Sequence, residues 1–253
     1  MPRRNVYLRF FLTTLAPLAI LCVSGCGGGL PLLHSAHVLP PGRVSAGAGL
    51  SGQVVLQDLP SAAGTDQSSL ETQVQNSTIA PAIAPWVSAR VGIAGSNEAG
   101  LSYTGRAIRL DARHSFKLNK KNSLALSAGL GGEVLLVGRP RTGSQDPQSL
   151  LGGGVDLPIL FGWRSTAGLY SAWIGPRPGI SFIQGAFADG TAFSARDGRL
   201  GFVGGLSLGF RQIHVAMELG GAFHFVNALV DETQRIEFTQ FTLTPAGALV
   251  LTF

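Results

Sequence analysis

The last stretch of the chain, QFTLTPAGALVLTF, alternates between two kinds of side chain and ends on Phe253. Most odd positions from Phe241 onward carry bulky apolar residues, whereas the even positions carry threonine, alanine and Val250. A period of two residues is typical of a β-strand with two different faces. Because the apolar face continues to the last residue, the pattern favours a strand whose outer face meets lipid over one that packs in a soluble domain.

The composition agrees with a membrane β-protein. Charged residues make up 13% of the 253 residues, about half the usual share of a soluble domain, and glycine is abundant at 35 residues. Beyond the N-terminal region, no uninterrupted apolar run approaches the ~20 residues that a membrane-spanning helix needs. High hydropathy without such a helix indicates either a very large core or a β-barrel.

The net charge of +5 gives little support for a nucleic-acid partner. Arg3, Arg4 and Arg9 belong to the N-terminal leader, and without them the charge is 5 − 3 = +2. The remaining sequence lacks a basic stripe with interleaved aromatic residues. We therefore expect no binding to nucleic acid, and we interpret the cluster of Lys117, Lys120 and Lys121 as a solvated turn.

The N-terminus has the form of a bacterial signal peptide, which we assign to residues 1–25. A basic start, MPRRNVYLRF, precedes an apolar region at 11–23 that is too short to span as a mature helix. The sequence Val23-Ser24-Gly25-Cys26 follows and resembles a lipobox, in which small residues precede a cysteine that becomes the acylated N-terminus. The alternative is ordinary secretory cleavage after a small residue.

Acylation of Cys26 would leave a mature chain without a second cysteine, because Cys22 is removed with the leader. Neither an intramolecular disulfide nor a cysteine metal site is then expected. Two acyl chains on one residue give stable membrane anchoring. The Gly/Pro-rich residues 26–41 form the expected tether, and residues 42–253 the barrel. His34 and His37 have no third ligand nearby, so we expect no metal and no other cofactor.

Alternating segments continue along the whole of residues 42–253. The segment at 98–116 changes parity near Gly105, where a hairpin with glycine first is favoured. Splitting it there gives ten strands, with short turns and longer loops at opposite ends and both chain ends on the periplasmic side; eight or twelve strands remain possible. The predicted strands are 44–56, 83–93, 98–104, 107–116, 124–136, 155–163, 169–187, 200–210, 213–225 and 240–253, and the predicted loops include 58–77, 138–149, 188–198 and 227–237.

Lipobox, alternating strands and terminal Phe253 together resemble the small outer-membrane β-barrel proteins of Gram-negative bacteria. The resemblance covers residues 42–253 and implies an antiparallel up-and-down transmembrane barrel in the cell outer membrane. It implies contact with outer-membrane lipid and with the lipoprotein-sorting and barrel-insertion machineries, with Phe253 as the C-terminal insertion signal. Five residues depart from the pattern because proline removes a ladder donor inside a strand: Pro85, Pro158, Pro176, Pro178 and Pro245.

Charged residues gather on the strand positions opposite the apolar face. A charge on the lipid face costs about 2–4 kcal/mol at the membrane midplane, so these side chains are expected in the lumen. A ten-stranded barrel is narrow, and they would form salt-bridged layers or line a small passage. The expected lumen residues are Arg43, Arg90, Glu98, Arg109, Asp111, Arg113, Glu133, Asp156, Arg199, Arg211, His214, Glu218 and His224.

Three functions fit these features. The first is a lipid-anchored, non-enzymatic barrel that is structural or a narrow passive channel. The second is a barrel hydrolase acting on lipid or peptide, in which Ser207 would approach His214 as nucleophile and base; no orienting acid or oxyanion donor is visible, so we assign no catalytic residue. The third is a periplasmic lipoprotein with a soluble lipocalin-like or sandwich fold, which requires an apolar interior and a polar exterior. Cargo and oligomeric state stay open.

Overall fold

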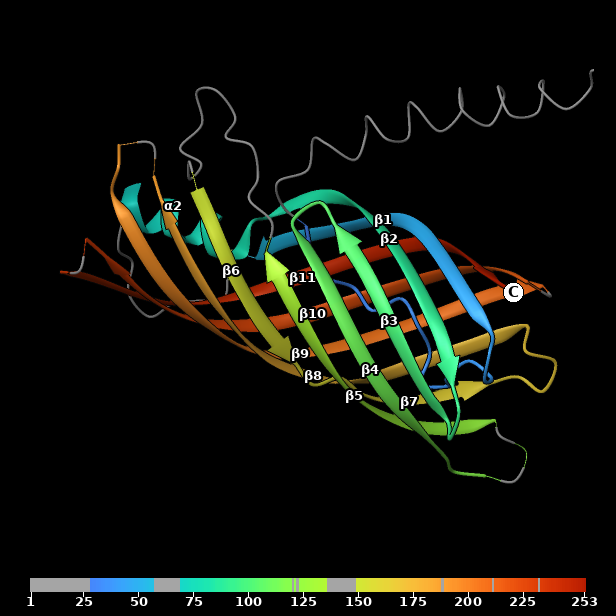
Figure 1. Ribbon diagram of the computed structural model, residues 1–253. Helices are drawn as coiled ribbons and strands as arrows, with labels where there is room; N and C mark the ends of the chain where they lie inside the picture. The colour runs from blue at the N-terminus through green and yellow to red at the C-terminus, as the bar shows by residue number, and fades with distance from the viewer. Residues whose placement is uncertain are drawn as a thin grey trace, which may run out of the picture.

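The computed structural model describes residues 28–56, 69–119, 121, 123–135, 149–187, 189–210, 212–231 and 233–253. Over these residues the chain forms one large antiparallel sheet with a single short helix (Figure 1). The helix is α2 (Ser69–Ile79) and follows the first strand. The strands are β1 (Val44–Leu56), β2 (Ala82–Ile93), β3 (Asn97–Thr104), β4 (Ala107–Lys117), β5 (Leu124–Leu135), β6 (Ser149–Asp156), β7 (Ile159–Arg164), β8 (Tyr170–Ala186), β9 (Ala192–Phe210), β10 (Ile213–Val230) and β11 (Gln234–Thr252).

The sheet closes into a barrel because the first and last strands pair with each other. β1 runs antiparallel to β11, with Ser45 opposite Thr252 and Leu56 opposite Phe241. β6 and β7 both lie between β5 and β8, one beside each half of these strands. The eleven described strands therefore occupy 11 − 1 = 10 positions. The predicted up-and-down antiparallel barrel of about ten strands is confirmed.

The two ends of the barrel differ in their connections. At the turn end, short connections join β2 to β3, β4 to β5, β7 to β8 and β9 to β10, and Phe253 lies there. At the loop end lie α2 and the connections from β3 to β4, β5 to β6, β8 to β9 and β10 to β11. β3 ends at Thr104 and β4 begins at Ala107, so the predicted hairpin at Gly105 and Arg106 is confirmed.

The outer surface is apolar and the interior is charged. Outward side chains such as Ile83, Leu110 and Leu50 are 72%, 64% and 61% exposed, while Arg109 and Glu98 are almost fully buried. A soluble lipocalin-like barrel or sandwich would show the opposite arrangement. The third interpretation of the sequence is therefore wrong.

Three of the five strand prolines lie where the ladder is interrupted at one point. Pro158 separates β6 from β7. On the neighbouring strand β8, pairing with β7 ends at Ile174 and pairing with β6 begins at Gly179. Pro176 and Pro178 fall between these two pairings. No residue of β6 or β7 stands opposite them, so their missing amide donors interrupt no ladder hydrogen bond with those two strands.

The other two prolines also meet gaps. Pro85 lies beyond the region where β2 pairs with β3, which begins at Trp86. Pro245 lies in a gap of the ladder between β1 and β11. Ser51 pairs with Ala246, and the next pair along the strands is Val54 with Leu243. The prolines are thus compatible with a closed barrel.

The structure extends the sheet at the loop end beyond the sequence prediction. α2 begins inside the predicted loop 58–77 and ends two residues beyond it, and β9, β10 and β11 include residues expected in loops 188–198 and 227–237. In this extension the pattern reverses: Phe193 and Val230 face inward and are buried, whereas Arg235 and Glu237 face outward and are exposed. The reversal removes the outward apolar signal on which the strand prediction depended.

Candidate functional site

Residues 28–42 run through the inside of the barrel, and we call them the lumen segment (Figure 1). At the loop end, the amide of Gly28 donates to the carbonyl of Ala80, just after α2. At the turn end, the amide of Gly42 donates to the carbonyl of Gly92. Between these points Ala36 is completely buried. The segment therefore crosses the lumen from the loop end to the turn end before it enters β1.

This course differs from that of the expected tether. Both chain ends were expected at the periplasmic turn end, whereas Gly28 lies at the loop end, opposite Phe253. Cys26, Gly27 and the leader lie outside the described residues. The lumen segment is not periodic, so its sequence carries no sign of the contacts that it makes with the wall.

Glu218 on β10 holds the centre of the lumen segment. Its Oε1 accepts a hydrogen bond from the amide of Leu32 at 2.7 Å, and its Oε2 accepts one from the amide of Leu33 at 2.7 Å. Oε2 also accepts from the indole nitrogen of Trp173 at 3.1 Å. All four residues are buried. The carboxylate thus satisfies two backbone donors that would otherwise be unpaired inside the barrel.

Charged wall residues hold the rest of the lumen segment. The guanidinium of Arg113 donates to the carbonyls of Ser35 and His37, and Glu98 accepts from the amide of Leu39 at 2.7 Å. Arg177 donates to the carbonyl of Leu30. Hydrogen bonds to charged partners are stronger than neutral ones. The segment is therefore bound along its length rather than loosely enclosed.

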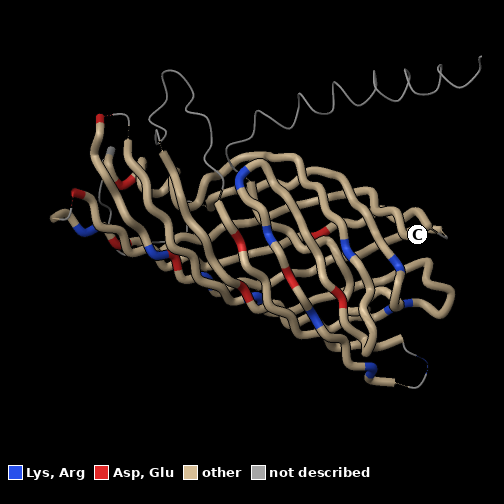
Figure 2. Tube along the Cα trace, in the orientation of Figure 1, with Lys and Arg blue, Asp and Glu red and all other residues tan. Residues whose placement is uncertain are grey.

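The wall residues are themselves joined in one ion-pair network, which runs from near the turn end, at Arg90 and Glu98, to the middle of the lumen. Arg109 contacts Asp111 at 2.7 Å and Asp156 at 2.8 Å. Arg90 bridges Asp111 and Glu98, Arg113 contacts Glu98 at 2.8 Å, and Arg177 contacts Asp156. Four guanidinium groups thus share three carboxylates, which leaves an excess of positive charge. Figure 2 shows the two charge types interleaved along the strands.

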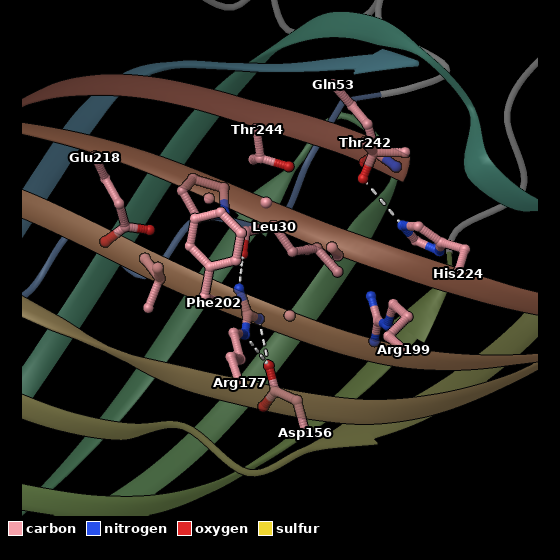
Figure 3. A pocket seen from close by; sticks show the side chains of 16 residues that line it. Leu30, Gln53, Asp156, Arg177, Arg199, Phe202, Glu218, His224, Thr242 and Thr244 are labelled. Atoms are coloured by element: carbon pink, nitrogen blue, oxygen red, sulfur yellow. Dashed lines mark hydrogen bonds and ion pairs between the residues drawn. The ribbon is translucent and has the colours of Figure 1, made fainter. Parts of the chain in front are cut away.

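A second polar group lies toward the loop end, beside a cavity of about 70 Å³ (Figure 3). His224 Nδ1 is 2.9 Å from Asp197 Oδ2, and its Nε2 is 3.1 Å from Thr242 Oγ1. Arg199, which lines the same cavity, pairs with Glu133 at 2.8 Å. A hydroxyl, an imidazole and a carboxylate in this order match the hydrogen-bond sequence of a hydrolase triad. Thr242 is only 1% exposed, however.

The loop end is closed above this group. Val74 of α2 packs in a buried apolar cluster with Phe187, Phe193 and Ile236. Arg106 lies in the β3–β4 hairpin and donates to the carbonyls of Ser77 and Thr78 at 3.0 and 2.7 Å. These carbonyls belong to the last turn of α2, whose negative dipole end favours a cation. The arginine therefore fixes the helix over the lumen.

The structure distributes the predicted lumen residues in three ways. Arg43 is exposed at the turn end, His214 is half-buried there, and Arg211 lies outside the described residues. His214 contacts the carbonyl of Gly168 at 3.4 Å, and in the described part of the chain it forms no hydrogen bond with Ser207. Those buried or half-buried inside the barrel are Arg90, Glu98, Arg109, Asp111, Arg113, Glu133, Asp156, Arg199, Glu218 and His224.

Two important lumen residues were missed by the sequence analysis. Arg177 stands between Pro176 and Pro178, where strand pairing was in doubt, and Asp197 lies in a predicted loop. Both would have been found by extending the inward parity of their strands. The lumen segment itself offered no comparable signal.

His34 in the lumen segment is buried beside the ion-pair network of the wall. Its Nδ1 lies 2.8 Å from Arg113 and accepts a hydrogen bond in the neutral form.

In the described part of the chain, no three His, Cys, Asp or Glu residues are grouped to hold a metal ion. No described helix is long and apolar enough to cross a membrane.

Comparison with known proteins gives no family. No protein-family model and no curated protein match the sequence. Neisserial surface protein A is 9% identical, with a TM-score of 0.38, over 83% of this chain and 96% of its own. The translocator domain of the autotransporter NalP from Neisseria meningitidis is 13% identical, with a TM-score of 0.39, over 86% and 90%.

An enzyme also appears among the similar structures. The outer membrane phospholipase A from Escherichia coli is 12% identical, with a TM-score of 0.28, over 91% of this chain and 95% of its own. Likenesses this distant assign no activity. The chain is characterised by its own architecture, a closed antiparallel β-barrel with an apolar exterior and a charged lumen through which residues 28–42 run.

Proposed function

We propose that the protein is an integral β-barrel of the bacterial outer membrane whose lumen is kept closed by its own N-terminal segment. The observation that carries the proposal is the combination of an apolar outer wall with a lumen segment bound by buried charges. The apolar wall suits lipid and would be costly in water. The role is then structural, and the bound segment argues against the narrow passive channel.

Membrane integration can be tested by extraction and by gel migration. A membrane barrel stays in the membrane fraction at alkaline pH, and its unheated form migrates differently from its heated form. Release of the folded protein by alkaline carbonate, without a gel shift, would contradict the proposal. Planar-bilayer recordings test the closed lumen: we expect no steady conductance from the wild-type protein, and frequent long openings would favour the passive channel instead.

Lipid anchoring at Cys26 is a separate part of the proposal. It rests on the lipobox-like Val23-Ser24-Gly25-Cys26. Labelling with [³H]palmitate should be lost in Cys26→Ala, while the unheated gel migration stays unchanged. Undiminished label in the variant would remove the anchor and leave the barrel assignment intact.

A barrel hydrolase is the second candidate, favoured by the contacts of His224 with Thr242 and Asp197. Because Thr242 is buried, α2 and the apolar cluster around Val74 at the loop end would have to move before any substrate could reach it. Lipid A mass profiles and phospholipid turnover should be compared between wild type and Thr242→Val after overexpression. A change present in the wild type and absent in the variant would establish the hydrolase, and identical profiles would remove its main support.

A further inference from the structure

The lumen segment leaves one large space unfilled, at the turn end of the barrel. This turn-end cavity has a volume of about 520 Å³ and lies between the segment and the inner wall. Trp86 on β2 and Trp173 on β8 line it from opposite sides of the barrel, and Arg43 is exposed at the same end. The volume falls within the range of about 300–1,000 Å³ that is usual for small-molecule sites.

The charges around the turn-end cavity are mostly positive. Arg43, Arg90, Arg113 and Arg164 line it, and Glu98 is the acidic residue among its lining side chains. Glu98 is already occupied, because it binds Arg90 and Arg113 and accepts from the amide of Leu39.

Two of these arginines have no counter-charge in the described part of the chain. Among the described residues, neither Arg43 nor Arg164 has a carboxylate within the 4 Å of an ion pair. Arg164 is half-buried at the end of β7, and it faces inward with Leu160. A partly buried guanidinium without an acidic neighbour is ready to bind an anion.

Hydroxyl groups surround the same space. The lining includes serines from four strands and one threonine, whose hydroxyls can donate to an anionic oxygen. His34 of the lumen segment lines the same space, and its Nδ1 lies 2.8 Å from Arg113. The hydroxyl-bearing lining residues of the wall are Ser45, Ser88, Ser171, Ser207 and Thr252.

We propose that the turn-end cavity binds a small soluble organic phosphate, whose phosphate group pairs with Arg43 and Arg164. A phosphate presents several acceptor oxygens, which suits guanidinium groups together with hydroxyl donors. The cavity is larger than an inorganic ion needs, so the ligand carries an organic part that lies against Trp86 and Trp173. This binding site is additional to the closed-barrel role and does not require conduction.

Isothermal titration calorimetry on the full chain in zwitterionic detergent tests the site. Glycerol 3-phosphate is the probe, and uncharged glycerol is its control. We expect saturable binding of the phosphate alone. Arg164→Gln and Arg43→Gln should each weaken it about tenfold or more, because each removes charge-assisted hydrogen bonds to the ligand.

Lys117→Gln is the matched control variant. Lys117 is exposed at the same end but does not line the cavity. Its removal deletes the same charge and should change the affinity less than about twofold at physiological salt, where screening acts over roughly 8 Å. Equal weakening in this variant would show unspecific attraction to a basic surface and overturn the site.

Folding is checked in every variant by the unheated gel migration. Arg43 is exposed, so Arg43→Gln keeps the test available if Arg164→Gln does not fold. Absence of saturable binding by the folded wild type up to about 10 mM probe would refute the proposal, as would binding of glycerol with equal affinity. Either result leaves the bilayer test of the closed lumen unaffected.

Discussion

Replacement of Glu218 by alanine should release the lumen segment while the barrel stays closed. The substitution removes the acceptor of the Leu32 and Leu33 amides and of the Trp173 indole. Each buried donor left unsatisfied costs about 1–3 kcal/mol, so the two backbone amides alone give about 2–6 kcal/mol. Glu218 lines the cavity of about 70 Å³, and water entering there would satisfy part of this loss.

We therefore expect about 2–3 kcal/mol less binding of the lumen segment, which raises its released population roughly 30- to 150-fold. Hydrogen–deuterium exchange with mass spectrometry measures this directly. Exchange at Leu32 and Leu33 should accelerate by a comparable factor, while the paired amides of β9 and β10 keep their protection. Glu218→Gln, which retains one acceptor oxygen, should give an intermediate acceleration.

Glu237→Ala is the control for the loss of an acidic side chain. Glu237 is more than half exposed and pairs with Arg235 far from the lumen segment. Its replacement should leave the exchange of Leu32 and Leu33 unchanged. If Glu218→Ala folds with normal gel migration and these amides exchange at the wild-type rate, the clamp assigned to Glu218 would be wrong.

Three further predictions test contacts at other points of the barrel. A Cβ at Gly92 would lie 2.1 Å from the carbonyl oxygen of Pro40. Gly92→Ala should therefore lower the temperature at which heating changes the gel migration of the protein. Gly132→Ala, whose Cβ meets open space, should leave this temperature unchanged. Arg106→Gln should cost about 1–3 kcal/mol by removing charged donors from the end of α2, seen as faster amide exchange in α2 with β3 unchanged. Arg109→Met leaves Asp156 with one fewer cation and should destabilise the barrel by about 3–5 kcal/mol in urea titrations; Arg235→Met, in an exposed pair, should cost no more than about 1 kcal/mol.

The apolar outer wall of the barrel was predictable because its signal is local. Alternation of apolar and polar residues repeats every two positions, so each strand shows its outer face in its own sequence. The parity change at Gly105 even indicated the β3–β4 hairpin, which fixed the strand count. The inward placement of residues such as Arg109 and Glu98 followed from the cost of charge on an apolar outer wall.

The loop-end extension was predicted poorly because the pattern reverses there. Beyond the apolar wall, Phe193 and Ile236 point inward and Arg235 points outward. A search for outward apolar residues therefore read these strands as loops. With the reversed parity, the same alternation would have extended β9, β10 and β11 and placed Asp197 beside His224.

The sequence by itself determined the barrel, its approximate strand number and which residues face outward, because these depend on the short-range periodicity of each strand. Tertiary structure alone decided that residues 28–42 run through the lumen. Leu32 meets Glu218 across 186 positions of sequence, and an irregular segment gives no periodic sign of such a contact. The course of this segment through the lumen depends on long-range hydrogen bonds to the wall, and no local pattern of the sequence encodes them.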